Sequence, residues 1–253
     1  MLEVRCVLDK KALVREYIKK HQYFSLSQII HDVNFEKKLV KDYLFQLKQE
    51  KIVFEAGYGF FSNVAEKFPF TAVRRVEVLR QCLKKNYPLV DFLIWDTKIF
   101  APLYHHTQTH HITFVEVEKD LVFSIHEHLY GKFRGVLKER RVKSFFAGFD
   151  VTLDPVVVRA MPSRSPREGN VPALEKILVD MYLDIDKYSY IGHSDYFELW
   201  WDLVRLYRIN IRELIGYSRR RKCLRQLFPQ LIDNTNSYAI AFCQLIAKVG
   251  KRL

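Results

Sequence analysis

The apolar positions of residues 24–61 predict two helices followed by a β-hairpin. Residues 25–28, Ser-Leu-Ser-Gln, fit a capping box. In this motif the Ser25 hydroxyl accepts a hydrogen bond from the backbone N–H of Gln28, and the Gln28 side chain bonds back to Ser25. This box predicts a short helix, and Asn34 suits the N-cap of the next one. The second helix is indicated by apolar side chains at helical spacing, namely Leu39, Val40, Tyr43, Leu44 and Leu47.

Two short strands are expected after these helices. Ile52–Phe54 and Phe60–Phe61 are apolar, and Ala56–Gly59 between them contains two glycines that supply the positive φ values of a hairpin turn. An earlier amphipathic helix, from Asp9 to about Lys20, completes a three-helix core. Helices and hairpin in this order predict a winged helix-turn-helix domain over residues 1–68.

The second predicted helix carries lysines opposite its apolar stripe. Lys37, Lys38 and Lys41 fall largely on the polar side, so one face packs on the domain and the other is cationic. This division is typical of a helix that recognises double-stranded DNA. The candidate DNA-binding residues are Ser25, Ser27, Asn34, Lys37, Lys38, Lys41 and Tyr58. The alternative is a winged helix that serves only as a protein-interaction module.

The pattern beyond residue 69 predicts a mixed α/β region and then a helical one. The expected helices and strands of the mixed region are a helix at 71–85, strands at 89–95 and 111–117, a helix at 120–130, and strands at 145–146 and 155–160. After a polar loop at 163–170, helices are expected at 172–182, 193–207, 211–227 and 236–248. The predicted fold class is α+β, with a winged helix-turn-helix (1–68) followed by a mixed α/β domain with a helical C-terminal layer (69–253).

Composition narrows the class of protein. The 253 residues are 49% hydrophobic and 28% charged, which is ordinary for a soluble globular protein. No apolar run is long enough for a transmembrane helix, and the N-terminus lacks the apolar core of a secretory signal. We therefore expect a cytoplasmic protein with no membrane partner. The four cysteines never form C-x-x-C, so we expect neither a zinc site nor a disulfide framework.

The net charge of +12 is spread unevenly along the chain. Residues 1–70 hold 12 Lys/Arg against 9 Asp/Glu, so the predicted DNA-binding domain is only weakly basic. Because DNA affinity depends on phosphate neutralisation, such a domain needs dimerisation or a second basic patch. The candidate patch residues are Arg140, Arg141, Arg219, Arg220 and Arg221. They are consistent with a nucleic-acid surface, with a surface for an acidic protein partner, or with a solvated face.

Acidic residues on two predicted strands suggest an alternative, enzymatic function. Asp91, Glu116, Glu118 and Lys119 resemble the carboxylates and lysine of a Mg²⁺-dependent nuclease of the restriction-endonuclease type. Those enzymes use Glu-x-Lys, which points both side chains to one side of a strand, whereas Glu118 and Lys119 are adjacent. A degraded or coincidental site explains the pattern better. We therefore assign no catalytic residue and expect a protein that is not an enzyme.

Four histidines lie close together in the sequence, at His105, His106, His110 and His111. No acid or cysteine joins them at familiar ligand spacing. We expect a loop entering a strand here and assign neither a metal nor a cofactor.

The chain resembles the AbiEi-like antitoxins of type IV toxin–antitoxin systems. The resemblance lies in the N-terminal winged helix and in VDFLIWDT (90–97), ITFVEVEKD (112–120), PALEKILVD (172–180) and LYRINIRELIGYSRRR (206–221). It implies an N-terminal domain that represses its own operon and a C-terminal domain that counters a nucleotidyltransferase-like toxin, a form of phage defence. The implied partners are the promoter DNA and the toxin. No catalytic residue is transferred by the resemblance.

Overall fold

The protein is a mixed α/β structure with several small sheets, seen here in a computed structural model that describes residues 2–71, 73–104, 111–139 and 154–227. The chain forms two compact units. The first unit comprises Met1–Phe68 together with Leu203–Leu253, and the second unit comprises Pro69–Asp202. The boundary at 68/69 coincides with the expected one. The helical segment after residue 203 groups with the first unit, although the sequence places it in the second domain.

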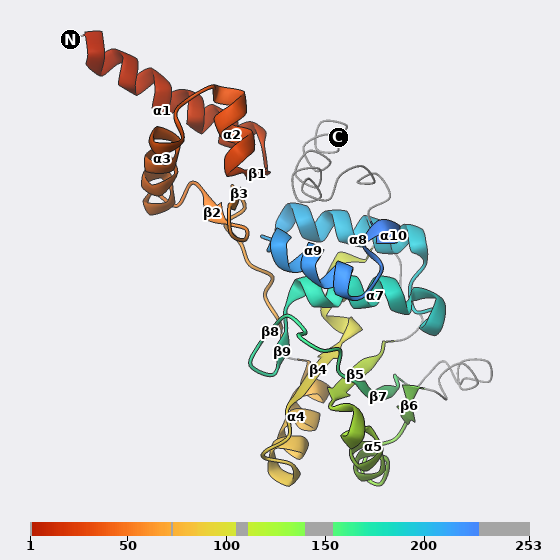
Figure 1. The fold of residues 1–253 in the computed structure, drawn as a ribbon. Coiled ribbons are helices and arrows are strands. Elements are labelled where there is room, and N and C mark those ends of the chain that lie inside the picture. The colour runs from red at the N-terminus through yellow and green to blue at the C-terminus, as the bar shows by residue number, and fades with distance from the viewer. Residues whose placement is uncertain (1, 72, 105–110, 140–153, 228–253) are drawn as a thin grey trace. The chain divides into compact units, whose positions relative to one another are not determined.

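The first unit begins with three helices and a three-stranded sheet (Figure 1). These elements are α1 (Leu2–Lys20), β1 (Tyr23–Ser25), α2 (Leu26–Val33), α3 (Lys37–Gln49), β2 (Phe54–Glu55) and β3 (Phe60–Ser62). The sheet is antiparallel in the order β1-β3-β2. One core joins the helices, and Val14 of α1, Ile29 of α2 and Leu47 of α3 are fully buried in it. The later part of the unit contains α9 (Ile211–Arg220) and α10 (Leu224–Leu227).

The start of α2 follows the sequence prediction, whereas the start of α3 differs from it. The Ser25 hydroxyl accepts from the Gln28 backbone at 3.1 Å, and Gln28 Oε1 accepts from the Ser25 backbone at 2.8 Å. The predicted capping box is therefore confirmed. Asn34 does not cap α3. It ends α2 in the left-handed conformation (φ 52°), which asparagine tolerates, and Glu36 occupies the N-cap of α3.

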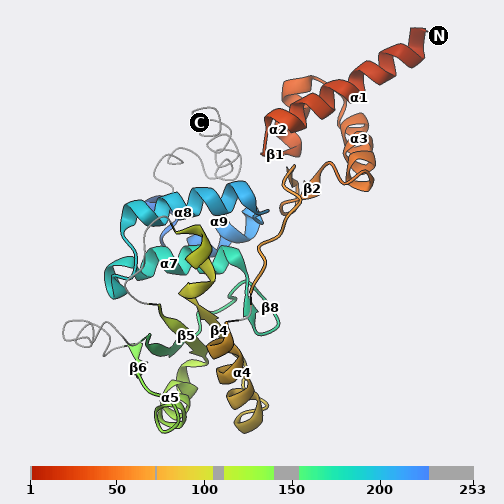
Figure 2. The same ribbon diagram turned by 180° about the vertical axis from the view of Figure 1, so that it is seen from behind.

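The second unit is a four-stranded sheet with helices on both faces (Figures 1 and 2). The strand order is β4-β5-β7-β6, with β4 antiparallel to β5 and the other neighbours parallel. The strands are β4 (Phe92–Asp96), β5 (Thr113–Val117), β6 (Val136–Lys138) and β7 (Val156–Ala160). The helices are α4 (Arg74–Asn86), α5 (Val122–Tyr130), α7 (Leu174–Tyr188) and most of α8 (His193–Leu206). Two 3₁₀ turns, Thr97–Leu103 and Lys119–Leu121, and the short pair β8 (Arg167–Glu168) and β9 (Val171–Pro172) complete it.

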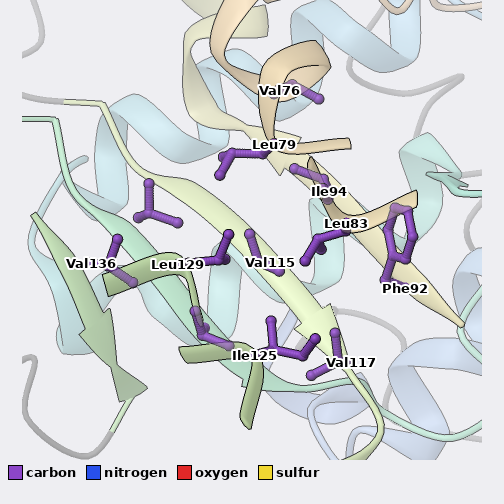
Figure 3. Packing of buried hydrophobic residues seen from close by; sticks show 12 residues of the cluster. Val76, Leu79, Leu83, Phe92, Ile94, Val115, Val117, Ile125, Leu129 and Val136 are labelled. Atoms are coloured by element: carbon purple, nitrogen blue, oxygen red, sulfur yellow. The ribbon is translucent and has the colours of Figure 1, made fainter. Parts of the chain in front are cut away.

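Strand alternation gives this sheet two different faces. Ile94 and Val115 point to the side covered by α4 and α5, where Leu79 and Leu129 meet them in an apolar cluster (Figure 3). The neighbouring position Glu116 points to the opposite side, where its carboxylate meets a side chain of α7. The apolar cluster thus lies on one face, which also holds the buried hydrogen bond from Thr113 to Asp96 at the end of β4, and the other face carries the buried charge of Glu116.

Most expected elements are present, with shifted bounds. The helix expected at 211–227 is instead two helices, because Lys222 takes a left-handed conformation (φ 58°) between α9 and α10. The loop expected at 163–170 contains β8. The strand expected at 145–146 and the helix expected at 236–248 lie outside the described residues. No helix in the described part of the chain is long and apolar enough to cross a membrane.

Candidate nucleic-acid interface

Helix α3 presents a lysine face to solvent. Lys37, Lys38 and Lys41 are exposed, whereas Val40 and Leu47 on the other side are fully buried. Within the described residues, none of the three lysines forms an ion pair. Their ammonium groups are therefore available to phosphates or base edges, as the sequence pattern predicts.

The other candidate residues near α2 and α3 differ in their exposure to solvent. Ser25 is only 3% exposed. Its hydroxyl caps α2 and also lies 2.9 Å from Ser27 Oγ. The Ser25 side chain thus serves as the N-cap of α2, and its assignment as a DNA contact stays a prediction. Ser27 and Asn34 are exposed. They stay in the candidate set.

The hairpin of β2 and β3, which we call the wing, carries Tyr58 at its tip. Gly57 (φ 109°) and Gly59 (φ 79°) flank it, as the turn prediction requires. The tip is closed by backbone bonds between Ala56 and Phe60 at 2.9 Å and between Phe60 and Gly57 at 2.9 Å. The Tyr58 side chain projects from this turn and is 83% exposed.

The wing is joined to the start of α9. The Ile211 backbone N–H donates to the Ala56 carbonyl at 2.9 Å. The Arg212 guanidinium carbon lies 5.1 Å from the centre of the Tyr58 ring, within cation–π range. Arg208 lies over Phe54 in the same way at 4.6 Å. Two arginines remote in sequence therefore become neighbours of the wing.

A second junction fixes this segment to β1. The buried Tyr23 hydroxyl donates to the Tyr207 carbonyl at 2.9 Å and accepts from the Ile209 backbone at 3.0 Å. Gln22 donates to the Arg205 carbonyl at 2.7 Å. The two Tyr23 bonds satisfy backbone groups of the α8–α9 connection, and the exposed Gln22 bond adds a contact to the end of α8.

The two units differ sharply in charge. Residues 203–227 carry eight Arg/Lys and a single acid, Glu213. The second unit, residues 69–202, has 18 Lys/Arg and 18 Asp/Glu. The whole net charge of +12 therefore belongs to the first unit. Residues 1–70 alone are weakly basic, and the first unit as a whole is strongly basic because residues 203–253 belong to it.

The predicted arginine patch is only partly described. Arg219 and Arg220 are exposed near the end of α9. Arg221 is half-buried and donates to the Tyr217 hydroxyl at 3.1 Å. Arg140 and Arg141 lie outside the described residues.

The second unit contains a buried ionic network between the sheet and α7. Glu116 is fully buried, with one carboxylate oxygen 2.7 Å from Arg159 Nη2 and the other 2.6 Å from Lys176 Nζ. Arg159 also binds Asp184, and Lys176 binds Asp180, each at 2.5 Å. Lys176 and Asp180, four residues apart on α7, thus form a buried ion pair that Lys176 also joins to the sheet through Glu116.

Burial and the two cations act in opposite directions on Glu116. Burial by itself would raise the pKa of this carboxyl, but Lys176 and Arg159 outweigh it and lower the pKa to about 2. The pKa of Asp184 is instead raised, because the effect of its burial outweighs the lowering effect of Arg159. The network is enclosed, places three carboxylates around two cations, and links α7 to the sheet through Glu116.

The residues proposed for a nuclease bind different partners. Glu116 is enclosed by Arg159 and Lys176, and Asp91 pairs with Arg167 at 2.5 Å. Glu118 and Lys119 are exposed beyond the end of β5. Among the described residues no three His, Cys, Asp or Glu side chains converge to hold a metal. A metal at Glu116 would first have to displace two cations.

Of the four clustered histidines, the structure describes His111. Its backbone N–H donates to the Asp154 carboxylate at 2.9 Å, next to the start of β5. His105, His106 and His110 lie outside the described residues.

A comparison with family models identifies the group to which the chain belongs. The model of a family of unknown function, DUF6577, matches residues 39–238, well over half of the chain. This chain is a member of the DUF6577 family. The DUF6577 match begins inside α3 and includes Lys41, the wing and α9, whereas Lys37 and Lys38 precede it. No curated protein matches the chain.

Sequence reasoning missed the contacts that Arg208, Arg212 and Tyr23 make between the segment around residues 207–212 and the wing or β1. Arg212 lies seven residues before Arg219 of the candidate patch, but nothing local in the sequence places it beside Tyr58. The usable signal was composition, since residues 203–227 are far more basic than any other stretch of similar length in unit one.

Proposed function

We propose that this protein is a transcriptional regulator that binds double-stranded DNA through a winged helix-turn-helix in its first unit. The order α1, β1, α2, α3, wing supports this proposal, with α3 as the recognition helix. The observation that carries it is the exposed lysine face of α3 in a unit that holds the entire net positive charge. A neutral second unit leaves the first as the electrostatic target for phosphates.

Two surfaces contact the DNA in this proposal. Helix α3 enters the major groove, where Lys37, Lys38 and Lys41 meet phosphates and base edges. The exposed side of α9 adds phosphate contacts through Arg212 and Arg219, starting beside Tyr58 of the wing. Arginine suits this task because its planar guanidinium pairs with phosphate through two hydrogen bonds.

The resemblance to AbiEi-like antitoxins extends the proposal to the biological role. We propose that the DNA is the protein's own promoter and that the second unit binds a nucleotidyltransferase-like toxin. The four resembling segments support this role, and three of them lie in the second unit. Co-purification with the product of a neighbouring nucleotidyltransferase-like gene tests it, and a neutralised toxin is the expected result.

DNA binding is tested by titrating the full-length protein into a fluorescent duplex taken from upstream of its gene. The variant K37E/K38E/K41E is expected to bind more than about tenfold more weakly, because three cationic contacts become repulsive. The matched control K84E/K85E/K132E changes the charge equally, at exposed positions of the second unit. Equal binding by both variants would remove α3 as the recognition helix. Absence of wild-type binding at low salt would leave a protein-interaction module.

A further inference from the structure

Helix α3 carries one large apolar side chain on its lysine face. Phe45 is 63% exposed, although it belongs to a helix whose other large apolar side chains are buried or partly buried. It lies four residues after Lys41 and seven after Lys38, so the three share one side of the helix. An aromatic ring in this position faces whatever the lysines face.

The surroundings of Phe45 indicate a small apolar target. The residues exposed on the same side of α3 are polar, namely Lys38, Lys41, Asp42, Gln46 and Gln49. A stable protein–protein contact needs a broad apolar centre, and a single ring within a polar surface does not provide one. A methyl group among polar neighbours matches this arrangement in size and in character.

The major groove of DNA presents such a group. Thymine carries a C5-methyl at the groove edge, next to the polar edges of the paired bases, and apolar side chains read it by contact. Lys38 and Lys41 on the same side of α3 bring the helix to the phosphates that border the groove.

We propose that Phe45 is a specificity-determining residue that contacts a thymine methyl in the DNA site. The inference rests on the proposed function and deepens it, because it assigns sequence reading to one side chain. The lysines hold the helix in the groove whatever the sequence, and Phe45 discriminates thymine from bases without the methyl.

The test replaces thymines by uracil, one at a time, across the duplex segment that the full-length protein protects. Uracil differs from thymine only by lacking the methyl group. Wild-type protein is expected to lose about fourfold in affinity at one or two positions, which corresponds to the burial of one methyl-sized group. Phe45→Ala is expected to show no uracil effect at those positions, and Phe45→Leu is expected to retain it. Because Phe45 is exposed, neither variant disturbs the core.

Three results would overturn this inference. They are a wild-type protein indifferent to uracil everywhere, a Phe45→Ala variant that keeps the full uracil effect, or a Phe45→Ala variant that changes only the oligomeric state. In each case K37E/K38E/K41E still reports on the proposed function separately. If that variant loses DNA binding while Phe45→Ala keeps the uracil effect, the proposed DNA binding is supported and the role of Phe45 is refuted. If wild-type protein binds no DNA, both fall.

Discussion

A β-carbon on Gly57 would lie 2.7 Å from Oδ1 of Asn210, although more than 150 residues separate the two in the sequence. Such a distance is shorter than real β-carbon contacts, so a residue larger than glycine at this position would displace the Asn210 side chain or shift the wing from the start of α9. The same β-carbon would lie 3.2 Å from the Arg212 β-carbon. The position of Arg212 beside Tyr58 thus depends on an absent side chain in the wing.

Gly57→Ala is expected to loosen the wing from α9, and Gly59→Ala serves as its matched control. Both glycines have positive φ, so either change strains the turn by about 1 kcal/mol, but no atom lies within 4 Å of a β-carbon at Gly59. Amide hydrogen exchange of residues 205–215 should accelerate in Gly57→Ala and stay near wild type in Gly59→Ala. Equal exchange in the two variants would contradict the close fit.

The arginines of α9 are expected to set the salt dependence of DNA binding. R212Q/R219Q should weaken binding to promoter and scrambled duplexes by the same factor and reduce the slope of log affinity against log salt by about two. The control R74Q/R134Q removes two exposed arginines from the second unit and should leave the slope unchanged. A wild-type slope in R212Q/R219Q would remove α9 from the interface.

Glu116→Gln is expected to destabilise the second unit by about 3 kcal/mol, because it leaves Arg159 and Lys176 buried with one carboxylate fewer. All three tryptophans, at 95, 200 and 201, lie in this unit, so their fluorescence during urea unfolding reports on it alone. Glu118→Gln, two residues along and exposed, should change the midpoint little. Similar midpoints for the two variants would show that the network contributes no stability.

The same network predicts a pH window. The pKa of Glu116 is lowered from 4.5 to about 2 by folding, so its ionised form stabilises the folded state above pH 4.5. This contribution falls as the pH drops from 4.5 towards 2, where the folded carboxyl takes up its proton. The stability difference between wild type and Glu116→Gln should therefore be constant at neutral pH and shrink below about pH 4.5. A stability difference between the two proteins that persists unchanged at pH 3 would contradict the prediction that the ionised Glu116 carboxylate stabilises the folded state.

Local pattern was sufficient wherever the determining contacts are close in sequence. The capping box at Ser25 and Gln28 involves residues three apart, and the apolar stripe of α3 repeats within two turns. The glycine turn of the wing depends on backbone conformations that few other residues adopt. Asn34 shows the limit of such reasoning, since the same residue suits a helix start and a left-handed helix end, and the path of the chain into α3 decided between them.

The sequence by itself determined the helices, the wing turn and the lysine face, because each follows from periodicity or from a short motif. The tertiary structure decided where charge gathers. Residues 203–253 belong to the same unit as residues 1–68, which turns a weakly basic domain into the carrier of the whole net charge. It also turned Glu116 from a candidate metal ligand into a buried partner of Arg159 and Lys176. Both outcomes depend on contacts between segments distant in the chain, which no local pattern encodes.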